Sequence, residues 1–306
     1  MVDTKQPLVS AVIITHNRKN LLSKAIRSVE SQTYQNIEII VVDDASSDGT
    51  DEMVSSNFSS CRYFKIPVAQ SRGGNHARNV GIRESKGDYI ALLDDDDEWL
   101  PEKIERQIKC IREVSDTRIV GCLRISENTK GSRVIESACK PSGDMRYKCL
   151  VTLSHTSSTL LIERQLMDQI GGFDENLTHW QDYEMLLRAC QHTNLECVNV
   201  PLVLLRHHDE KKDPSRLTNN LEKWEKAISY IESKHAELIA AAPKDIQHKR
   251  LAVIAHDGLK RCIRVGNKKK QKEYLGKVYR VEPSVKHYLE WKLNLLTLKP
   301  WLWFNK

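Results

Sequence analysis

Asp88-Tyr-Ile-Ala-Leu-Leu-Asp-Asp-Asp-Asp97 joins an apolar run to four consecutive aspartates. The apolar run is typical of a buried strand, which should end where the carboxylates converge. Crowded carboxylates repel one another and lose hydration. A divalent cation such as Mg²⁺ or Mn²⁺ would relieve both effects, because hard ions prefer oxygen ligands and share them with substrate phosphates. A solvated acidic loop would have the same local sequence, so the rest of the chain has to distinguish a metal site from such a loop.

The segments around this run alternate between strand and helix patterns. Apolar runs mark strands, and apolar residues repeated every three or four positions mark helices. Strands are expected at residues 9–15, 37–42, 62–66 and 88–93, and helices at 21–32, from about 47, from about 75 to 85, and from Pro101 in a first-turn position. This order predicts an α/β fold, a mostly parallel, doubly wound sheet with helices on both faces.

Polar residues follow three of the expected strands. Thr15-His-Asn-Arg18 follows the first strand, Asp43-Asp44 follows the second, and Asp94 to Asp97 follows the apolar run quoted above. In an open parallel sheet the carboxyl ends of the strands lie at one edge, where ligands bind. Three polar strand ends at that edge favour a ligand or metal site over a solvated loop.

The chain has two electrostatic halves. Its formal net charge is +6, but residues 221–306 hold 19 Lys and Arg against 9 Asp and Glu, whereas residues 1–220 hold 28 against 32. From about residue 215 the patterns are helical only. We therefore expect an α/β domain at residues 1–212 and a basic helical extension at residues 213–306, which could contact an anionic partner.

Two features that the sequence lacks predict the cellular compartment of the protein. No hydrophobic stretch has the length of a signal peptide or of a membrane-spanning helix, and the eight cysteines include no C-x-x-C pair. These features predict a cytoplasmic protein with reduced cysteines and without a zinc knuckle or a thioredoxin-like motif.

Six motifs occur in order within residues 8–210. They are Val12-Ile-Ile-Thr-His-Asn-Arg18, Val41-Val-Asp-Asp-Ala-Ser-Ser-Asp-Gly-Thr50, Ala77-Arg-Asn-Val-Gly81, Gly87-Asp-Tyr-Ile-Ala-Leu-Leu-Asp-Asp-Asp-Asp-Glu-Trp99, Gly171-Gly-Phe-Asp174 and Gln181-Asp-Tyr-Glu-Met-Leu-Leu-Arg188. Together they resemble the family 2 inverting glycosyltransferases. The resemblance implies the Rossmann-like GT-A fold and a nucleotide-diphosphate sugar donor. It also divides the domain into a nucleotide-sugar half at about residues 1–98 and an acceptor half at about residues 99–212.

The resemblance assigns several residues to the donor. Thr15, Asn17 and Arg18 would line the nucleotide pocket, Asp44 would accept hydrogen bonds from the base, and Arg78 would lie near the nucleotide. Judged by residue type alone, Asn17 could instead cap a helix, and Arg78 could be an ordinary surface cation.

Asp94-Asp95-Asp96 matches the D-x-D motif of the family. The resemblance implies that Asp96 binds Mn²⁺ or Mg²⁺ directly, that Asp94 faces the ribose or the metal, and that Asp95 supports the nucleotide sugar. Alternation along an extended chain would put Asp94 and Asp96 on one side. The metal would neutralise the charge on the departing diphosphate. Asp97 and Glu98 are expected to form only a solvated rim.

Asp182 matches the catalytic base of the family, although Gln181 stands where the motif more often has Glu. Inversion requires one in-line displacement, in which a carboxylate removes the proton of the acceptor hydroxyl as its oxygen attacks the anomeric carbon. A carboxylate at a helix start is also favoured by the helix dipole alone. The two explanations are compatible, because a base at a helix start is well anchored.

The resemblance also suggests residues for the metal and the acceptor. One of His207 and His208 would approach the metal or the diphosphate, and His208 is preferred, although both could be ordinary polar residues. Gly172 and Phe173 would shape the acceptor side. Trp180 would stack on a sugar ring or, equally, pack in a core.

The C-terminal segment combines positive charge with aromatic rings. Nine Lys and Arg and a single acid lie between Lys260 and Arg280, and three of the six tryptophans lie in the last 16 residues. This composition suits a peripheral anchor on the anionic inner face of a membrane, although a solvated helix face with a packed C-terminus would share it. With the resemblance, a membrane contact implies a lipid-linked acceptor, and the donor is expected to be a UDP-linked hexose. An example is a sugar on undecaprenyl diphosphate, in O-antigen, capsule or exopolysaccharide synthesis.

Other functional classes fit the motifs less well. A sugar-nucleotide pyrophosphorylase should have a glycine-rich loop after the first strand, and a dinucleotide dehydrogenase needs G-x-G-x-x-G there, but Thr15-His-Asn-Arg18 contains no glycine. A nucleic-acid-binding protein should place positive charge along the cleft, whereas here the expected cleft is acidic. We therefore expect no nucleic acid partner.

Overall fold

The computed structural model describes residues 6–128, 131–136, 142–152, 155–206 and 220–284. Contacts divide the chain into two compact units. The first, called the α/β unit below, comprises Met1–Leu177 and Gln181–Glu210. The second, called the helical unit, comprises Thr178–Trp180 and Lys211–Lys306.

The α/β unit is built around one sheet. Its strands are β1 (Val9–Thr15), β2 (Ile37–Asp44), β3 (Arg62–Ile66), β4 (Tyr89–Asp94), β5 (Asp97–Trp99), β6 (Thr117–Glu127), β7 (Arg133–Ile135), β8 (Leu161–Glu163) and β9 (Asn194–Arg206). Its helices are α1 (Lys19–Glu30), α2 (Thr50–Asn57), α3 (Gly74–Glu84), α4 (Lys103–Glu113), α5 (Arg164–Ile170) and α6 (Gln181–Ala189). Three short 3₁₀ helices connect them: η1 (Val68–Gln70), η2 (Lys148–Val151) and η3 (Ser157–Thr159).

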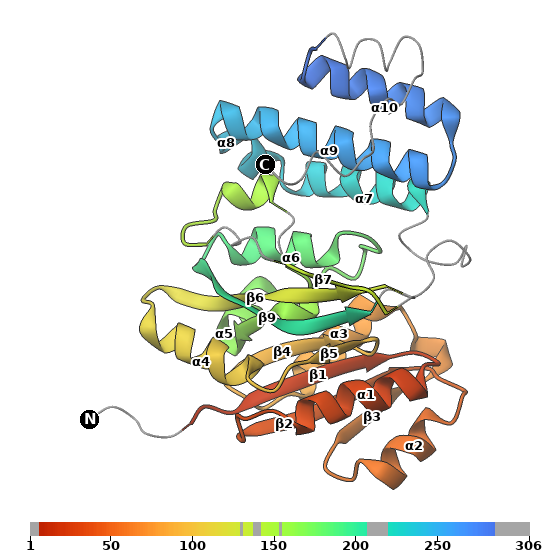
Figure 1. Cartoon of the computed structure of the whole chain (residues 1–306), viewed down its shortest axis with the longest axis vertical. Coiled ribbons are helices and arrows are strands. Elements are labelled where there is room, and N and C mark those ends of the chain that lie inside the picture. The colour runs from red at the N-terminus through yellow and green to blue at the C-terminus, as the bar shows by residue number, and fades with distance from the viewer. Residues whose placement is uncertain (1–5, 129–130, 137–141, 153–154, 207–219, 285–306) are drawn as a thin grey trace. The chain divides into compact units, whose positions relative to one another are not determined.

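The strand order is β3-β2-β1-β4-β8-β6-β9-β5, and β7 pairs with β6 (Figure 1). β3, β2, β1 and β4 are mutually parallel, as expected from the strand and helix alternation. β8 is antiparallel to both β4 and β6, whereas β6 and β9 pair in parallel. The predicted α/β class is confirmed, and antiparallel pairs enter the second half of the sheet.

Helices cover both faces of the parallel strands because both sets of alternating side chains are apolar. Ile13 belongs to the same buried cluster as Ile26 of α1. Its neighbour Val12 points to the other face, where α3 crosses. There a Cβ on Gly81 would lie 2.3 Å from Val12 Cγ1, so only glycine lets α3 approach this closely.

The helix expected from Pro101 begins two residues later, at Lys103. Asp97–Trp99 form β5, which is antiparallel to β9, and the backbone N–H of Leu100 donates to the carbonyl of Leu202 at 2.9 Å. This pairing holds the chain extended as far as Leu100, so the helix begins only after a turn.

The helical unit contains α7 (Leu221–Lys234), α8 (Ala236–Ala241), α9 (Lys244–Arg264) and α10 (Lys268–Val281). The side chains of Asn220 and Asn267 cap α7 and α10 by accepting backbone N–H bonds from Lys223 and Lys270. Such caps stabilise a helix by about 1 kcal/mol. Trp224, which is fully buried, lies at the centre of the core of this unit.

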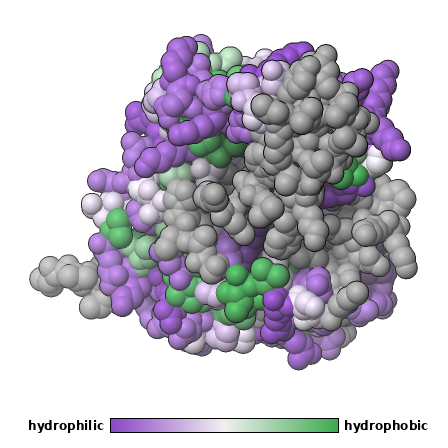
Figure 2. Space-filling model, turned by 45° about the horizontal axis from the view of Figure 1, so that its top comes forward, coloured by the Kyte–Doolittle hydropathy of each residue, from purple (hydrophilic) through white to green (hydrophobic). Residues whose placement is uncertain are grey.

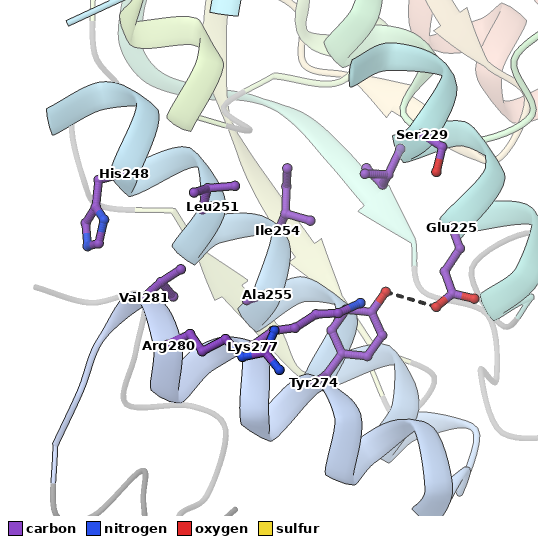
Figure 3. Close-up of a pocket in the computed structure, with 11 residues that line it drawn as sticks. Glu225, Ser229, His248, Leu251, Ile254, Ala255, Tyr274, Lys277, Arg280 and Val281 are labelled. Atoms are coloured by element: carbon purple, nitrogen blue, oxygen red, sulfur yellow. Dashed lines mark hydrogen bonds between the residues drawn. The ribbon is translucent and has the colours of Figure 1, made fainter. Parts of the chain in front are cut away.

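A cavity of about 720 Å³ opens between α7, α9 and α10 (Figure 3). Apolar side chains share it with several polar ones, and the hydroxyl of Tyr274 donates to Glu225 at 3.0 Å across it. Its lining residues are Glu225, Ile228, Ser229, His248, Leu251, Ile254, Ala255, Tyr274, Lys277, Arg280 and Val281.

The described surface in Figure 2 is largely hydrophilic, and its hydrophobic side chains form small separate patches. Among the described residues, no helix combines the length and the hydrophobicity needed to cross a membrane. In the same part of the chain the cysteines form no disulfide.

Candidate active site

Asp94 to Asp97, called the acidic turn below, lead from β4 into β5 at the carboxyl edge of the parallel strands. Asp95 and Asp97 are buried, at 5% and 7% exposure, whereas the side chains of Asp94 and Asp96 are 33% and 22% exposed. Asp94 and Asp96 are thus the more open pair of the acidic turn, although they were predicted only to lie on one side of an extended chain. They are separated by a turn, however, rather than carried on one extended strand.

The expectation that Asp97 and Glu98 form a solvated rim is wrong for Asp97, which is buried. β5 pairs with β9, and within β5 the Asp97 side chain is buried whereas the Glu98 side chain is 26% exposed. Asp97 accepts a hydrogen bond from the hydroxyl of Ser158 at 2.6 Å, and burial raises its pKa well above the ordinary value. Glu98 forms an ion pair with Arg206 at 2.8 Å.

The polar tail of β1 meets the acidic turn because β1 and β4 are neighbours in the sheet. Thr15 Oγ1 donates to Asp95 at 2.8 Å, and Arg18 Nη1 lies 3.2 Å from Asp95 and 3.1 Å from Asp96. Burial raises the pKa of Asp95 to about 6, although Arg18 and the Thr15 hydroxyl oppose the shift. The carboxylates are therefore crowded and only partly neutralised.

The two carboxylate oxygens of Asp44, at the end of β2, differ in their hydrogen bonding. Its Oδ2 accepts the backbone N–H of Gly73 at 3.1 Å. Its Oδ1 is buried and has no hydrogen-bond partner among the residues described. A buried acceptor left unpaired costs about 1–3 kcal/mol, so a ligand N–H or O–H would be favoured here.

Asn17 does not cap α1, whose N-cap residue is Arg18. The side-chain oxygen of Asn17 accepts the backbone N–H of Ser47 at 2.8 Å, and the backbone N–H of Asn17 donates to the hydroxyl of Ser46 at 2.7 Å. Asn17 thus joins the loop after β1 to the loop after β2, which brings both beside Asp44.

Arg78 on α3 is buried, so the surface-cation alternative is wrong. Its Nη2 donates to Asp94 at 2.6 Å, and its guanidinium lies 5.5 Å from the ring centre of Phe173. Burial opposes its positive charge, but Asp94 and Asp182 more than compensate and raise its pKa. One guanidinium therefore interacts with the acidic turn and with α6.

Gly172 and Phe173 dock against α3 through Asn79. The backbone N–H of Phe173 donates to Asn79 Oδ1 at 2.8 Å, and Asn79 Nδ2 returns a bond to the carbonyl of Phe173 at 2.9 Å. Gly172 has φ of +71°, and a Cβ there would lie 2.5 Å from Asn79 Oδ1. Phe173 is buried, and its ring packs against the Arg78 guanidinium.

Asp182 lies in the first turn of α6, where the helix dipole favours a carboxylate. The hydroxyl and the backbone N–H of Ser157 both donate hydrogen bonds to it. Loss of hydration raises the pKa of Asp182, whereas Arg78 lowers it and Asp94 raises it further. A carboxylate in this setting is a stronger base than an exposed aspartate.

The remaining predicted residues do not join this group in the described structure. Trp180 belongs to the helical unit, and its ring meets that of Trp224 edge-on at 6.1 Å between centres. This contact is the packing alternative that the sequence left open. His207 and His208 lie outside the described residues.

Ser157 and Ser158 are contacts of the acidic residues that the sequence did not reveal. Short turns with hydroxyl residues are common, and neither periodicity nor a motif distinguishes this one. Both serines are fully buried, and only the tertiary fold brings them to Asp182 and Asp97.

Within the described residues, no group of three or more His, Cys, Asp or Glu is arranged to hold a metal ion by itself. Asp94 and Asp96 nevertheless supply the hard oxygen donors that Mg²⁺ and Mn²⁺ prefer. Mg²⁺ is commonly bound by one or two carboxylates together with substrate phosphates. Burial is the main cause of the raised pKa of Asp95, and the charges of Asp96 and Asp94 add to it, so the acidic turn fits a cation shared with a diphosphate.

Residues 10–171 match the family model described as glycosyl transferase family 2. An uncharacterised glycosyltransferase of Rickettsia typhi, RT0329, is 31% identical over 83% of this chain and 80% of its own length. Another relative is the Escherichia coli UDP-Glc:alpha-D-GlcNAc-diphosphoundecaprenol beta-1,3-glucosyltransferase WfgD. It is 28% identical over 65% of this chain and 76% of its own.

Solved structures share the fold. TarS of S. aureus, residues 1–349 in complex with UDP-GlcNAc, has a TM-score of 0.63 at 17% identity, over 90% of this chain and 82% of that one. The mannosyltransferase PcManGT of Pyrobaculum calidifontis, in complex with GDP-Man and Mn²⁺, has a TM-score of 0.61 at 16% identity, over 95% and 80%. The GT-A fold expected from the motifs is therefore confirmed.

Proposed function

This chain belongs to glycosyl transferase family 2 and is a glycosyltransferase, and we propose that it moves a hexose from a UDP-linked donor to a hydroxyl of a lipid-linked sugar acceptor, with inversion. The observation that carries the proposal is the buried Arg78. Its guanidinium interacts with Asp94 of the acidic turn and with Asp182 on α6. The carboxylates assigned to the donor and to proton transfer therefore belong to one site.

Asp182 is the base of this reaction. Its carboxylate takes the proton of the acceptor hydroxyl while the hydroxyl oxygen bonds to the anomeric carbon of the donor sugar. The bond from that carbon to the diphosphate oxygen breaks, and the nucleoside diphosphate leaves with the electron pair. The raised pKa of Asp182 supports this role, because it increases the affinity of the carboxylate for the proton.

The donor nucleotide lies at the ends of β1 and β2. The unpaired Oδ1 of Asp44 accepts an N–H of the base, and Thr15, Asn17 and Arg18 complete the pocket. A uridine nucleotide is supported by the relative WfgD, whose name gives UDP-Glc as its donor, and by TarS, which was solved with UDP-GlcNAc.

A divalent cation, Mn²⁺ or Mg²⁺, would be held by Asp96 with Asp94, and Asp95 supports the same turn. When bound, the ion acts as a Lewis acid that stabilises the charge of the departing diphosphate. Arg18 balances part of the charge of the turn through Asp95 and Asp96. His208 would add a ligand from the segment after β9.

The acceptor is a sugar on a lipid diphosphate at the inner face of the cell membrane. WfgD is named for such an acceptor. The basic residues 213–306 form the membrane-associating extension of a catalytic domain at residues 1–212, and the cavity between α7, α9 and α10 adds apolar surface to them. Gly172 and Phe173 form the acceptor side of the site.

A donor panel tests the proposal. The purified chain is incubated with UDP-Glc, UDP-Gal or UDP-GlcNAc, Mn²⁺ and a synthetic lipid-diphosphate N-acetylglucosamine acceptor, and product is measured by mass spectrometry. We expect transfer from one UDP-hexose, loss of transfer in EDTA, and a β-linked product by NMR if the α-linked donor is inverted.

The variants Asp96→Ala and Asp44→Ala separate the two parts of the donor site. Asp96→Ala should abolish the metal dependence together with most of the activity, whereas Asp44→Ala should weaken UDP binding in calorimetry about 10-fold. A product that retains the donor configuration, or full turnover in EDTA, would refute the mechanism.

A further inference from the structure

The 3₁₀ helix η3 packs beside β4, β6 and β9, and all three of its residues are 0% exposed. No residue of η3 has been given a role in the proposed reaction. Its side chains nevertheless contact both groups of acidic residues on which the proposed reaction depends.

The first contact is with α6. Ser157 donates its hydroxyl proton to Asp182 Oδ1, and its backbone N–H donates to the same carboxylate. Arg78 from α3 and Asp94 from the end of β4 are the charged groups that face Asp182. The Ser157 hydroxyl is thus the neutral partner that fixes the orientation of this carboxylate.

The second contact is with the acidic turn. Ser158 Oγ donates to Asp97 Oδ2 at 2.6 Å and accepts the backbone N–H of Asp94 at 3.2 Å. The Ser158 carbonyl accepts the indole N–H of Trp99 at 3.0 Å. Ser158 therefore bridges the last residue of β4 and the first residue of β5, on either side of Asp95 and Asp96.

Side chains of α4 hold η3 in place through hydrogen bonds. Gln107 Nε2 donates to the carbonyls of Thr159 and Val120, both at 2.9 Å. Lys103, which is fully buried, donates to Gln107 Oε1 at 2.9 Å and lies 4.2 Å from the ring centre of Trp99. Burial lowers the pKa of Lys103 to about 8. The hydrogen bond to Gln107 and the contact with the Trp99 ring offset part of the cost of burying this amine.

We propose that η3 is a positioning element that sets the base and the acidic turn relative to each other, with Ser157 orienting Asp182 and Ser158 fixing the turn through Asp97 and the Asp94 backbone. The proposal rests on the function proposed above. A single rigid turn in contact with both carboxylate groups leaves little freedom for one to move without the other, and misplacement of reacting groups by about 1 Å can cost 100-fold in rate.

The two serines should affect different steps. In Ser157→Ala, the pKa of Asp182 loses a hydrogen bond that lowers it, so the acid limb of the kcat/KM profile should move to higher pH by roughly 0.5–1.5 units. At neutral pH kcat should fall roughly 10-fold. UDP affinity with Mn²⁺, measured by calorimetry, should stay at the wild-type value. Ser157→Thr restores a hydroxyl and should recover most of the activity and the original limb.

Ser158→Ala should produce the opposite pattern. The acidic turn loses the donor to Asp97 and the acceptor for the Asp94 N–H, so UDP affinity with Mn²⁺ should weaken roughly 5–10-fold and the donor KM should rise with it. The acid limb of kcat/KM should stay in place.

Ser85→Ala is the matched control for removal of a buried hydroxyl. Ser85 is 7% exposed, and its hydroxyl donates to the Gly81 carbonyl at 2.9 Å near the end of α3. We expect wild-type kcat, KM and UDP affinity in this variant, whatever its loss of stability.

Two results would overturn the proposal, because a turn with a merely structural role would produce either. One is an acid limb that does not move in Ser157→Ala, and the other is equal losses of kcat and UDP affinity in both serine variants. Failure of the proposed function gives a different result. If Asp182→Asn kept full activity, the base assignment would fail and the Ser157 role would fail with it. The UDP titration of Ser158→Ala needs no turnover and would still decide the role of Ser158.

Discussion

Replacing Arg78 by Met removes the cation that joins the acidic turn to α6 and keeps a side chain of similar length. Arg78 Nη2 lies 2.6 Å from Asp94 Oδ1, and the Arg78 side chain is only 10% exposed. Met keeps the unbranched apolar part of the side chain but loses the guanidinium, so the change removes the charge and its contact with the Phe173 ring.

The expected loss of stability follows from burial. Removing one partner of a fully buried ion pair costs about 3–5 kcal/mol, because the other charge is left uncompensated. The Asp94 side chain is 33% exposed and can regain water, so we expect about 2 kcal/mol. Activity should fall further, by roughly 100- to 1000-fold in kcat/KM, which is typical of the loss of one preorganised charge-stabilising group.

Urea unfolding at pH 7.5 with linear extrapolation gives the stability change. Arg72→Met is the control, because the Arg72 side chain is 69% exposed and lies 4.0 Å from Glu175. Its effect should stay within about 0.5 kcal/mol. A double-mutant cycle with Asp94→Asn should give a coupling energy of about 1–2 kcal/mol. Equal stability of the Arg78 and Arg72 variants, with no coupling to Asp94, would refute the assignment of Arg78.

Three further predictions concern other parts of the molecule. Gly172→Ala should destabilise the fold by about 1–3 kcal/mol in thermal unfolding, because φ is +71° and the new Cβ would strike Asn79, whereas Gly171→Ala, with nothing within 4 Å, should show only the backbone strain. The folded-state pKa of Asp95 is raised to about 6, so the stability that its protonated form contributes is present below about pH 4 and is lost as pH rises through 6. In EDTA, Asp95→Asn should therefore gain about 1–2 kcal/mol relative to wild type between pH 4 and pH 7, and a constant difference would contradict this. Replacing Lys268, Lys269 and Lys272 by Gln should weaken binding to phosphatidylglycerol vesicles by about 1 kcal/mol per charge, with no binding to phosphatidylcholine by either form.

The parallel half of the fold was predictable because each of its elements has a strong local pattern. β1 and β3 have the expected bounds, and α3 begins one residue before the expected position. β5 was not predictable, since Asp97–Trp99 is an acidic segment that becomes a strand only by pairing with β9, whose contact residues are over 100 positions away. The late start of α4 has the same cause.

The site shows the same division between local and tertiary information. The acidic turn, Asp44 and Arg78 were found because they occur within motifs or at strand ends. The burial of Asp97 depends on Ser158 and β9, which no local pattern associates with it. The packing of Trp180 on Trp224 likewise joins residues far apart in sequence, and a lone aromatic residue carries no signal for its partner.

The turnover of Asp182→Asn tests the central claim most directly. Asn keeps the shape of Asp and can still accept the hydrogen bond from Ser157, but it cannot take a proton from the acceptor hydroxyl. At saturating UDP-hexose, acceptor and Mn²⁺, kcat should fall by roughly 100- to 10,000-fold, as expected for loss of a general base, while UDP affinity stays unchanged. A kcat within twofold of wild type would contradict the account.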